Sequence, residues 1–319
     1  MKKIVILDGY TTIRDDLNWQ VFEELGNVDV YERTPPELVI ERAKDAEVIL
    51  TNKVFLGKEQ LQNLPKLKYV GILATGYNNI DLDTARNLGI VVTNIPNYGT
   101  DSVAQCIFAH ILNISNAIET HSQAVKNGAW TKSPDICFCL TKQVELANLT
   151  LGLIGYGAIG KKTAQIAKAF SMNVIAHTPR LELGKTDQFA TYTSLDDIFA
   201  KSDIIAMCCP LNAQTDKIIN AQSIAKMKDG AWIINTGRGG LIDEPALADA
   251  LKSGKIGAIG VDVLSVEPPS ADNPLISAPN SNISPHNAWT TTQARQRLID
   301  IAFNNLKSWI NGNQINVVS

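Results

Sequence analysis

The chain has 319 residues, of which 45% are hydrophobic and 19% charged, and its formal net charge is −3. This composition is that of a folded protein and excludes a disordered chain. The slightly acidic balance argues against nucleic acid or an anionic membrane as a partner, and no apolar run has the length of a membrane span. We expect a cytoplasmic protein with two domains. Its five cysteines lack the paired spacing of a zinc site, and we expect them to be free, buried thiols.

Short apolar runs that favour β-strands recur along the chain, with helical stretches between them. The first third holds four such runs, at residues 4–7, 48–50, 69–73 and 90–93. From residue 150 onward there are six, at residues 151–154, 174–176, 204–208, 232–235, 259–263 and 282–284. Strands that alternate with helices predict parallel sheets with helices on both faces. The predicted fold class is therefore α/β, with two doubly wound parallel sheets.

Two long helices stand outside this alternation. Thr100, Asp101 and Ser102 supply capping residues, and apolar side chains then recur at helical spacing as far as Ile118. This helix, at residues 102–119, would suit a connector between two domains. A second amphipathic helix, near residues 291–311, follows the last predicted strand, and we expect it to pack back on the first block. One domain would then comprise residues 1–99 and 287–319, and the other residues 100–286.

The sequence GYGAIG, at residues 155–160, directly follows a predicted strand and precedes a predicted helix at residues 161–170. In that setting the first glycine permits a tight turn, the second lets the backbone approach a pyrophosphate, and the third lets the helix pack against the strand. The free N–H groups of the helix N-terminus then face the anion. The alternative is an ordinary glycine-rich turn. The predicted dinucleotide-binding residues are Gly155, Tyr156, Gly157, Ala158, Ile159 and Gly160.

The end of the next strand bears on which dinucleotide binds. An NAD site normally has Asp or Glu there to bind the ribose 2′-hydroxyl, but positions 177–180 hold no carboxylate. Thr178 and Arg180 would instead suit a 2′-phosphate, which arginine binds through charge-assisted hydrogen bonds. NADP(H) is therefore favoured, with NAD(H) as the other candidate. In the second case Arg180 is an exposed surface arginine, and NAD binds without its usual carboxylate.

Three polar residues each follow a predicted strand of the second block. Arg238 lies between glycines after strand 232–235, Glu267 follows strand 259–263, and His286 follows strand 282–284. Open parallel sheets bind their ligands at these carboxyl ends. An arginine there can bind a small carboxylate with its planar fork, and a histidine can exchange a proton with a carbonyl oxygen. A carboxylate beside the histidine would fix its tautomer.

Together with the run ATGYNNID at residues 74–81, these motifs resemble the D-isomer-specific 2-hydroxyacid dehydrogenases, over essentially the whole chain. DGY at residues 8–10, RTPP at 33–36 and VLSVEPP at 263–269 are most similar to the branch of glycerate dehydrogenases, or hydroxypyruvate reductases. The resemblance implies a Rossmann-type cofactor domain and a flavodoxin-like substrate domain around a cleft. It also implies a homodimer through helix 102–119. The implied reaction is reduction of a small 2-oxo acid, such as hydroxypyruvate or glyoxylate, to the D-2-hydroxy acid.

The resemblance implies roles for individual positions. Arg238 would bind the substrate carboxylate, His286 would donate the proton, and Glu267 would hold His286 protonated and aligned. The implied substrate-binding residues are Asn52, Lys53, Thr75 and Gly76, and the further cofactor residues are Pro210, Thr236 and Asp262. Asp262 could alternatively cap a turn, and Trp289 could either line the pocket or simply pack.

Two other functions are compatible with the same fold. A formate dehydrogenase shares the architecture but, on this resemblance, pairs its histidine with glutamine, so Glu267 argues against it. A nicotinamide-sensing binding protein would keep the glycine motif but has no need of Arg238, Glu267 and His286, and function is better argued from a site than from a fold. The expected partner is therefore a small acid, with no metal ion.

Overall fold

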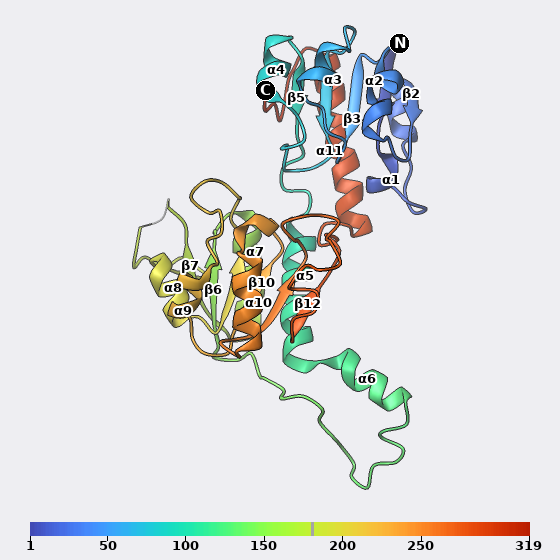
Figure 1. Ribbon diagram of the computed structural model, residues 1–319. Helices are drawn as coiled ribbons and strands as arrows, with labels where there is room; N and C mark the ends of the chain where they lie inside the picture. Colours follow the sequence, from blue (N-terminus) through green and yellow to red (C-terminus); the bar gives the residue numbers. More distant parts are fainter. Residues whose placement is uncertain (180–181) are drawn as a thin grey trace. The chain divides into compact units, whose positions relative to one another are not determined.

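The computed structural model describes residues 1–179 and 182–319. The chain forms two compact units. Unit 1 comprises Met1–Gly99 and Trp289–Ser319, and unit 2 comprises Thr100–Ala288. Each unit is built on one parallel sheet (Figure 1). The predicted α/β class with two parallel sheets is therefore confirmed.

Unit 1 contains a five-stranded sheet with the order β2-β1-β3-β4-β5. This is the flavodoxin-like order, in which the direction of winding reverses between β1 and β3. The strands are β1 (Lys2–Ile6), β2 (Gly26–Val30), β3 (Val48–Thr51), β4 (Tyr69–Ile72) and β5 (Val91–Thr93). The helices are α1 (Gly9–Thr12), α2 (Val39–Ala43), α3 (Lys58–Gln62), α4 (Leu82–Asn87) and α11 (Thr292–Ile310), with 3-10 turns η1 (Gln20–Glu24) and η2 (Pro36–Leu38).

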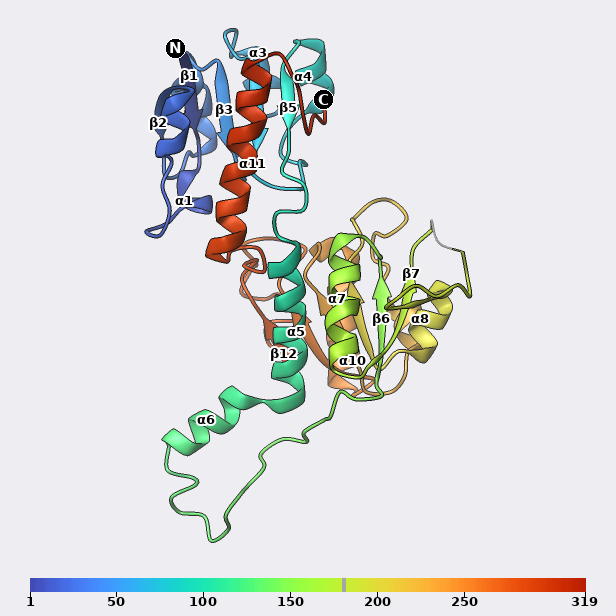
Figure 2. The ribbon, with the colours of Figure 1, turned by 180° about the vertical axis from the view of Figure 1, so that it is seen from behind.

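The core of unit 1 has two layers, one on each face of the sheet. Ile4 and Ile6 of β1 pack with residues of α11, the helix that Figure 2 shows along one face of this sheet. Val5 and Leu7 pack with residues of α2, α3 and α4. Successive side chains of a strand point to opposite faces, so a run that is apolar at every position is buried on both.

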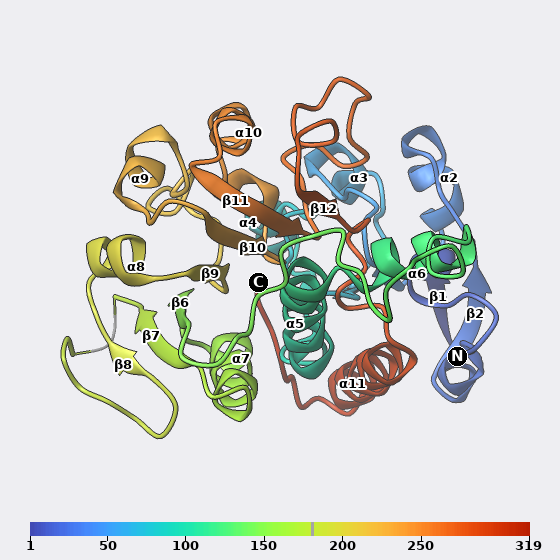
Figure 3. The same cartoon turned by 90° about the horizontal axis from the view of Figure 1, so that it is seen from below.

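Unit 2 contains a seven-stranded sheet with the order β12-β11-β10-β9-β6-β7-β8. Counted outward from β6 this is the Rossmann order, and the winding reverses between β6 and β9. The strands are β6 (Thr150–Ile154), β7 (Asn173–His177), β8 (Thr191–Tyr192), β9 (Ile204–Met207), β10 (Ala231–Asn235), β11 (Ile256–Val261) and β12 (Ser281–Ile283). The helices are α5 (Thr100–Asn116), α6 (Ile118–Lys126), α7 (Ala158–Ala169), α8 (Leu195–Lys201), α9 (Ala221–Lys226) and α10 (Glu244–Lys252), with the 3-10 turn η3 (Gly239–Leu241). Figure 3 shows α5 and α7 on one face of this sheet, with α8, α9 and α10 on the other.

One segment of unit 2, the arm (residues 117–140), extends away from the sheet (Figures 1 and 2). Ala117 has a left-handed conformation (φ 46°) that turns the chain from α5 into α6. Residues 127–149 contain neither helix nor strand. Several large apolar side chains of the arm are exposed, among them Ile118, Trp130 and Ile136, of which Ile136 is 91% exposed.

The structure departs from the sequence-based expectations in three places. Strands β2 and β8 are absent from the prediction, and the predicted helix over 102–119 is interrupted at Ala117. All five cysteines are free, but Cys137 and Cys139 are exposed in the arm, so the expectation of buried thiols is wrong for these two. Over residues 1–179 and 182–319, every helix is too short or too polar to span a membrane.

Candidate active site

The carboxyl ends of β10, β11 and β12 are neighbours, because these strands are adjacent in a parallel sheet. Arg238 lies in the loop after β10, Glu267 in the loop after β11, and His286 in the loop after β12. The three residues predicted to be catalytic therefore belong to three adjacent loops of unit 2.

His286 and Glu267 are in direct contact. Nδ1 of His286 lies 2.6 Å from Oε2 of Glu267, and Oε1 of Glu267 accepts a hydrogen bond from the N–H of Leu264 (3.0 Å). Because the carboxylate accepts the Nδ1 proton, Nε2 is the ring nitrogen that can exchange a proton with a ligand. The side chains of His286 and Glu267 are 26% and 36% exposed, so the pair is accessible.

Asp262 organises the turn that carries His286. The backbone of His286 is left-handed (φ 52°), which is uncommon for a residue other than glycine. The carbonyl oxygen of Asp262 accepts a hydrogen bond from the N–H of His286 (2.8 Å). Its buried carboxylate accepts from the N–H groups of Asn287 and Ala288, both at 2.9 Å. These three hydrogen bonds fix the chain on both sides of the imidazole.

Arg238 is exposed, and its guanidinium donates a hydrogen bond to the carbonyl oxygen of Gly237 (2.8 Å). The side chain of Asn235 fixes this loop, donating to the carbonyl oxygen of Arg238 (2.9 Å) and accepting from the N–H of Gly237 (3.0 Å). A Cβ at Gly239 would lie only 1.9 Å from the carbonyl carbon of Leu264. The absence of a side chain at Gly239 therefore lets the loop after β10 pack directly against the loop after β11.

Glu244, which the sequence did not single out, anchors the loop that contains Glu267. Its buried carboxylate accepts hydrogen bonds from the N–H of Ser265 (2.7 Å), the hydroxyl of Ser265 (2.8 Å) and the amide of Asn273 (2.8 Å). It thereby ties residues on both sides of Glu267 to the first turn of α10. The sequence signal for this role is weak, because an acid in a first helical turn is common for dipole reasons alone.

The glycine loop lies between β6 and α7, in the predicted strand–turn–helix order (Figure 2). Gly155 has φ 98°, and a Cβ there would lie 2.5 Å from the carbonyl carbon of Cys208. A Cβ at Gly160 would lie 2.4 Å from the carbonyl oxygen of Gly155. At Gly157, by contrast, a Cβ would have no neighbour within 4 Å. The loop is therefore tightly packed at its ends and open in the middle, where a pyrophosphate must approach the backbone.

Three other residues of the glycine motif begin α7 or support the loop. Ala158 and Ile159 are the first two residues of α7. Tyr156 is buried, and its hydroxyl donates a hydrogen bond to Asp187 (3.0 Å). Its side chain therefore anchors the segment that follows β7.

Thr236 and Pro210 follow β10 and β9, at the same edge of the sheet as the glycine loop. The hydroxyl oxygen of Thr236 is buried and has no hydrogen-bond partner within the described residues. A buried polar atom of this kind is expected where a ligand supplies the partner. The carbonyl oxygen of Pro210 accepts from the hydroxyl of Thr215 (2.7 Å). With the open space at Gly157, these residues fit a dinucleotide.

The end of β7 is described in part. The ring of His177 contacts the carbonyl oxygen of Thr193, with Nδ1 at 3.0 Å. Thr178 follows and is partly buried. Arg180, the residue predicted to bind a 2′-phosphate, lies outside the described residues. The next acid along the chain, Glu182, forms an ion pair with Lys185.

In unit 1, a buried carboxylate links the carboxyl ends of β1 and β3. Asp8 accepts hydrogen bonds from the hydroxyl of Thr51 (3.0 Å) and from the N–H groups of Asn52 (2.9 Å) and Lys53 (2.6 Å). The amide of Asn52 donates to the carbonyl oxygen of Leu73 (2.6 Å). The predicted substrate residues Asn52 and Lys53 thus have their backbone N–H groups committed to Asp8, which the sequence did not single out as functional.

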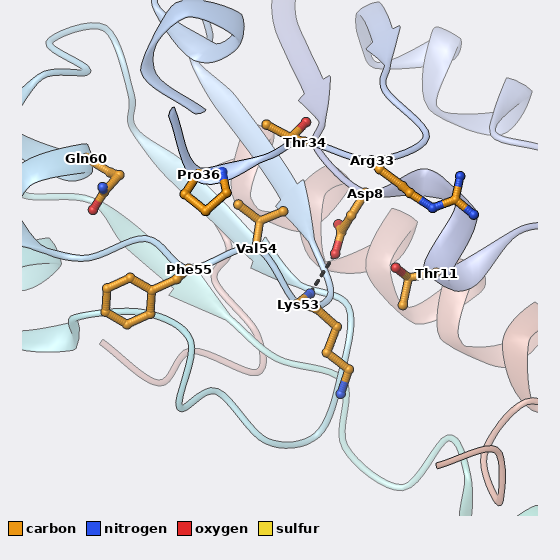
Figure 4. A pocket seen from close by; sticks show the side chains of 9 residues that line it. All are labelled: Asp8, Thr11, Arg33, Thr34, Pro36, Lys53, Val54, Phe55 and Gln60. Carbon is orange, nitrogen blue, oxygen red and sulfur yellow. Dashed lines mark hydrogen bonds between the residues drawn. The ribbon is translucent and has the colours of Figure 1, made fainter. Parts of the chain in front are cut away.

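A pocket of about 370 Å³ opens beside Asp8 (Figure 4). Lys53 is the predicted substrate residue that lines it. Figure 4 shows the N–H of Lys53 bonded to Asp8, with the ammonium end of its side chain extending away from that carboxylate. The other residues of the wall are Thr11, Arg33, Thr34, Pro36, Val54, Phe55 and Gln60.

Thr75 and Gly76 follow β4 in the same unit. The hydroxyl of Thr75 donates to the carbonyl oxygen of Ile95 (2.8 Å), and the carbonyl of Thr75 accepts from Asn94 (2.8 Å). The N–H groups of Thr75 and Gly76 have no acceptor in the part of the chain that the structure describes. Consecutive N–H groups of this kind are suited to binding an anion.

Trp289 is the last of the residues considered from the sequence. Trp289 packs edge-on against Tyr98, with ring centroids 6.1 Å apart, in the core of unit 1. Among residues 1–179 and 182–319, no group of histidines, cysteines and acids has an arrangement that could hold a metal ion.

Comparison with known proteins shows which family and which proteins this chain is similar to. A family model described as "D-isomer specific 2-hydroxyacid dehydrogenase, NAD binding domain" matches residues 108–288. The chain is 45% identical to a hydroxypyruvate reductase of Blautia hydrogenotrophica, over 99% of both chains. It is 38% identical to a glycerate dehydrogenase of Methylorubrum extorquens, also over 99% of both chains.

Solved structures share the whole fold. An acyclic imino acid reductase (Bsp5) in complex with NADPH and D-Arg aligns with a TM-score of 0.86 at 29% identity, covering 99% of this chain and 100% of the other. A glyoxylate reductase from Paecilomyes thermophila aligns with a TM-score of 0.84 at 28% identity, covering 99% and 98%.

Proposed function

Because this chain belongs to the family of D-isomer-specific 2-hydroxyacid dehydrogenases, we propose that it reduces hydroxypyruvate or glyoxylate to D-glycerate or glycolate. The observation that carries the proposal is the 2.6 Å contact between His286 and Glu267, in loops adjacent to that of Arg238. The similarity to a hydroxypyruvate reductase and a glycerate dehydrogenase over nearly the whole chain supports the choice of substrate.

Two side chains act on the substrate, and a third holds one of them in place. When bound, the reduced nicotinamide supplies a hydride to the keto carbon. Arg238 binds the substrate carboxylate with its planar fork and polarises the keto oxygen. His286 donates its Nε2 proton to that oxygen as the C=O bond becomes CH–OH. Glu267 accepts the Nδ1–H and keeps the ring aligned, with Nε2 directed to the substrate.

The two units have separate tasks in this proposal. Residues 1–99 and 287–319 form the substrate domain, in which the N–H groups of Thr75 and Gly76 bind the carboxylate and Lys53 adds positive charge. Asn52 holds the neighbouring turn. Residues 100–286 form the dinucleotide-binding domain. Its cofactor contacts come from the glycine loop, Pro210, Thr236 and Asp262, the last of these meeting the nicotinamide carboxamide.

NADP(H) is the proposed cofactor. No carboxylate stands at positions 177–180 to bind a ribose 2′-hydroxyl, whereas Thr178 offers a hydroxyl and Arg180 a guanidinium to a 2′-phosphate. The structurally similar imino acid reductase was solved with NADPH. A titration of the protein with NADPH and NADH tests this choice, and equal affinity for both would refute it.

The proposed assembly is a homodimer through helix 102–119 and its continuation into the arm. The apolar face of α5 covers the sheet of its own unit, but Ile118, Trp130 and Ile136 of the arm are exposed. Such side chains favour association with a second copy. Light scattering of the purified protein measures the mass of the assembly.

The proposed location is the cytoplasm, where free thiols such as Cys137 and Cys139 persist.

The decisive experiment follows the absorbance of the reduced cofactor after a 2-oxo acid is added. We expect a rapid fall with hydroxypyruvate or glyoxylate and none with larger 2-oxo acids. The same protein incubated with formate and oxidised cofactor distinguishes a formate dehydrogenase. Cofactor binding without turnover on any acid would favour a sensing protein and refute the proposal.

A further inference from the structure

His110 lies on α5 and is buried between that helix and the sheet of unit 2. The strand β11 passes directly beneath it at Gly260, where a Cβ would lie 2.5 Å from the Cβ of His110. Any side chain at residue 260 would therefore push α5 away from the sheet. The glycine allows the imidazole to reach across β11 toward the end of β12.

At the end of β12 the imidazole enters a chain of hydrogen bonds. Nε2 of His110 lies 3.1 Å from the hydroxyl oxygen of Ser284, and that hydroxyl donates to the carboxylate of Asp262 (2.6 Å). A serine hydroxyl has a single proton. Since this proton goes to Asp262, the serine oxygen accepts from His110, and Nε2 of His110 must carry a hydrogen.

The protonation state of His110 agrees with this direction. Burial lowers the pKa of His110, and the opposing effect of the Asp262 carboxylate is smaller. The ring is therefore neutral near pH 7, with its hydrogen on Nε2. A neutral donor at this position orients the Ser284 hydroxyl without placing a second charge beside Asp262.

We propose that His110 is a positioning residue for the proton-donating His286, acting through Ser284 and Asp262. Asp262 accepts hydrogen bonds both from Ser284, the partner of His110, and from the backbone around His286. Its Oδ1 accepts from both Ser284 (2.6 Å) and the N–H of Asn287 (2.9 Å), and its carbonyl oxygen accepts from the N–H of His286. The orientation of the Asp262 carboxylate thus sets the left-handed turn at His286. This inference rests on the proposed function only for the role of His286 in proton transfer.

A double-mutant cycle tests the link. His110→Leu keeps apolar bulk but removes the donor, and Ser284→Ala removes the hydroxyl. One net hydrogen bond corresponds to about 0.5–1.5 kcal/mol, so we expect His110→Leu to lower kcat about 2- to 12-fold. KM for the 2-oxo acid should change little, because the misplaced group acts in the transition state. The double variant should be no slower than Ser284→Ala alone, since both changes break one chain.

Two further variants separate positioning from packing. His110→Gln places an amide N–H near the position of Nε2 and should recover most of kcat. Ile111→Ala, a neighbouring buried position on α5, should lower the melting temperature but leave kcat unchanged. Multiplicative losses in the cycle, or an equal loss of kcat in Ile111→Ala, would overturn the inference.

A spectroscopic readout makes the inference independent of turnover. The imidazole NMR signals of His286 can be assigned by comparison with His286→Gln. His110→Leu should shift these signals, and His110→Gln should return them toward the wild-type position. Unshifted His286 signals would overturn the inference even in an active enzyme. A shift would support it even where hydroxypyruvate is not reduced and the proposed function has failed.

Discussion

The loops at the carboxyl ends of the two sheets expose different kinds of chemical group. In unit 2 the loops present side chains, and buried carboxylates hold the backbone behind them, as Asp262 does for His286 and Glu244 for the loop of Glu267. In unit 1 the loop after β4 presents backbone N–H groups at Thr75 and Gly76, and Asp8 holds the neighbouring turn after β3. Under the proposed function, the loops of unit 2 supply the proton donor and Arg238, and the loop after β4 of unit 1 supplies backbone N–H groups for the substrate carboxylate.

This difference predicts which kinetic constant each substitution should change. A side chain that changes its charge or its bonding in the transition state affects kcat, whereas a contact made equally in ground and transition states affects KM. Changes at the unit 2 loops should therefore lower turnover, and changes behind the unit 1 loops should weaken substrate binding. Four experiments test this division.

The largest effect is expected for His286→Gln. Loss of the positioned proton donor should lower kcat about 10²- to 10⁴-fold, because Gln cannot supply a proton to the keto oxygen. Affinity for the reduced cofactor, measured by fluorescence titration, should be unchanged. Near-normal turnover of hydroxypyruvate by this variant would show that the proton comes from another group.

Arg238→Lys should have the next largest effect. Lysine keeps the charge but loses the planar fork that binds a carboxylate. The lost charge-assisted hydrogen bond corresponds to about 1.5–3 kcal/mol, or roughly 100-fold in kcat/KM at the upper end. Both kcat and KM should worsen in steady-state assays. Lys252→Arg, on an exposed lysine paired with Asp249, is the control and should behave as wild type.

The preference between NADPH and NADH tests whether side chains of unit 2 also determine cofactor specificity. Arg180→Ala should weaken NADPH about 10- to 100-fold, by loss of one charged hydrogen bond, with NADH nearly unaffected. Thr178→Asp should go further, because it adds repulsion against the 2′-phosphate and an acceptor for the 2′-hydroxyl. Titration of each variant with both reduced cofactors measures this. An equal loss for NADPH and NADH in Arg180→Ala would mean that Arg180 is only a surface charge.

The smallest effect is expected for Asp8→Asn in unit 1. Asn keeps the shape but replaces one acceptor oxygen by a donor, which leaves one N–H of the turn at Asn52 and Lys53 without its partner. We expect KM for the 2-oxo acid to rise about tenfold, equivalent to about 1.4 kcal/mol, at an almost unchanged kcat. Asp16→Asn, which breaks the ion pair with the buried Arg295, controls for loss of stability in the same unit. A fall in kcat without a change in KM would contradict the division between the units.

Most of the framework could be predicted from the sequence, because it depends on local patterns. All ten predicted strands are present, since their continuous apolar runs, such as residues 4–6 of β1 and 48–50 of β3, are buried on both faces. Strand β2 was missed because it lies at the sheet edge and carries polar residues such as Asp29. The break at Ala117 was missed because neither glycine nor proline marks it.

The anchoring residues could not be predicted, because their partners are far away in the sequence. Asp8 bonds to residues more than 40 positions later, and Glu244 to residues 21 and 29 positions later. An acid after a strand or in a first helical turn has no distinctive local pattern. Cys137 and Cys139 were misjudged for a related reason. Their exposure follows from the arm leaving the sheet, which the local composition does not reveal.

The order of the units along the chain has a consequence for biosynthesis. Five side chains of α11 complete the core of unit 1, namely Ala294, Leu298, Ile299, Ala302 and Leu306. The ribosome makes α11 only after all of unit 2. At the usual rate of about 5–20 residues per second, roughly 10 to 40 seconds separate residue 99 from this helix. Unit 2 can fold during that interval. Until α11 is made, the sheet of residues 1–99 has one apolar face uncovered.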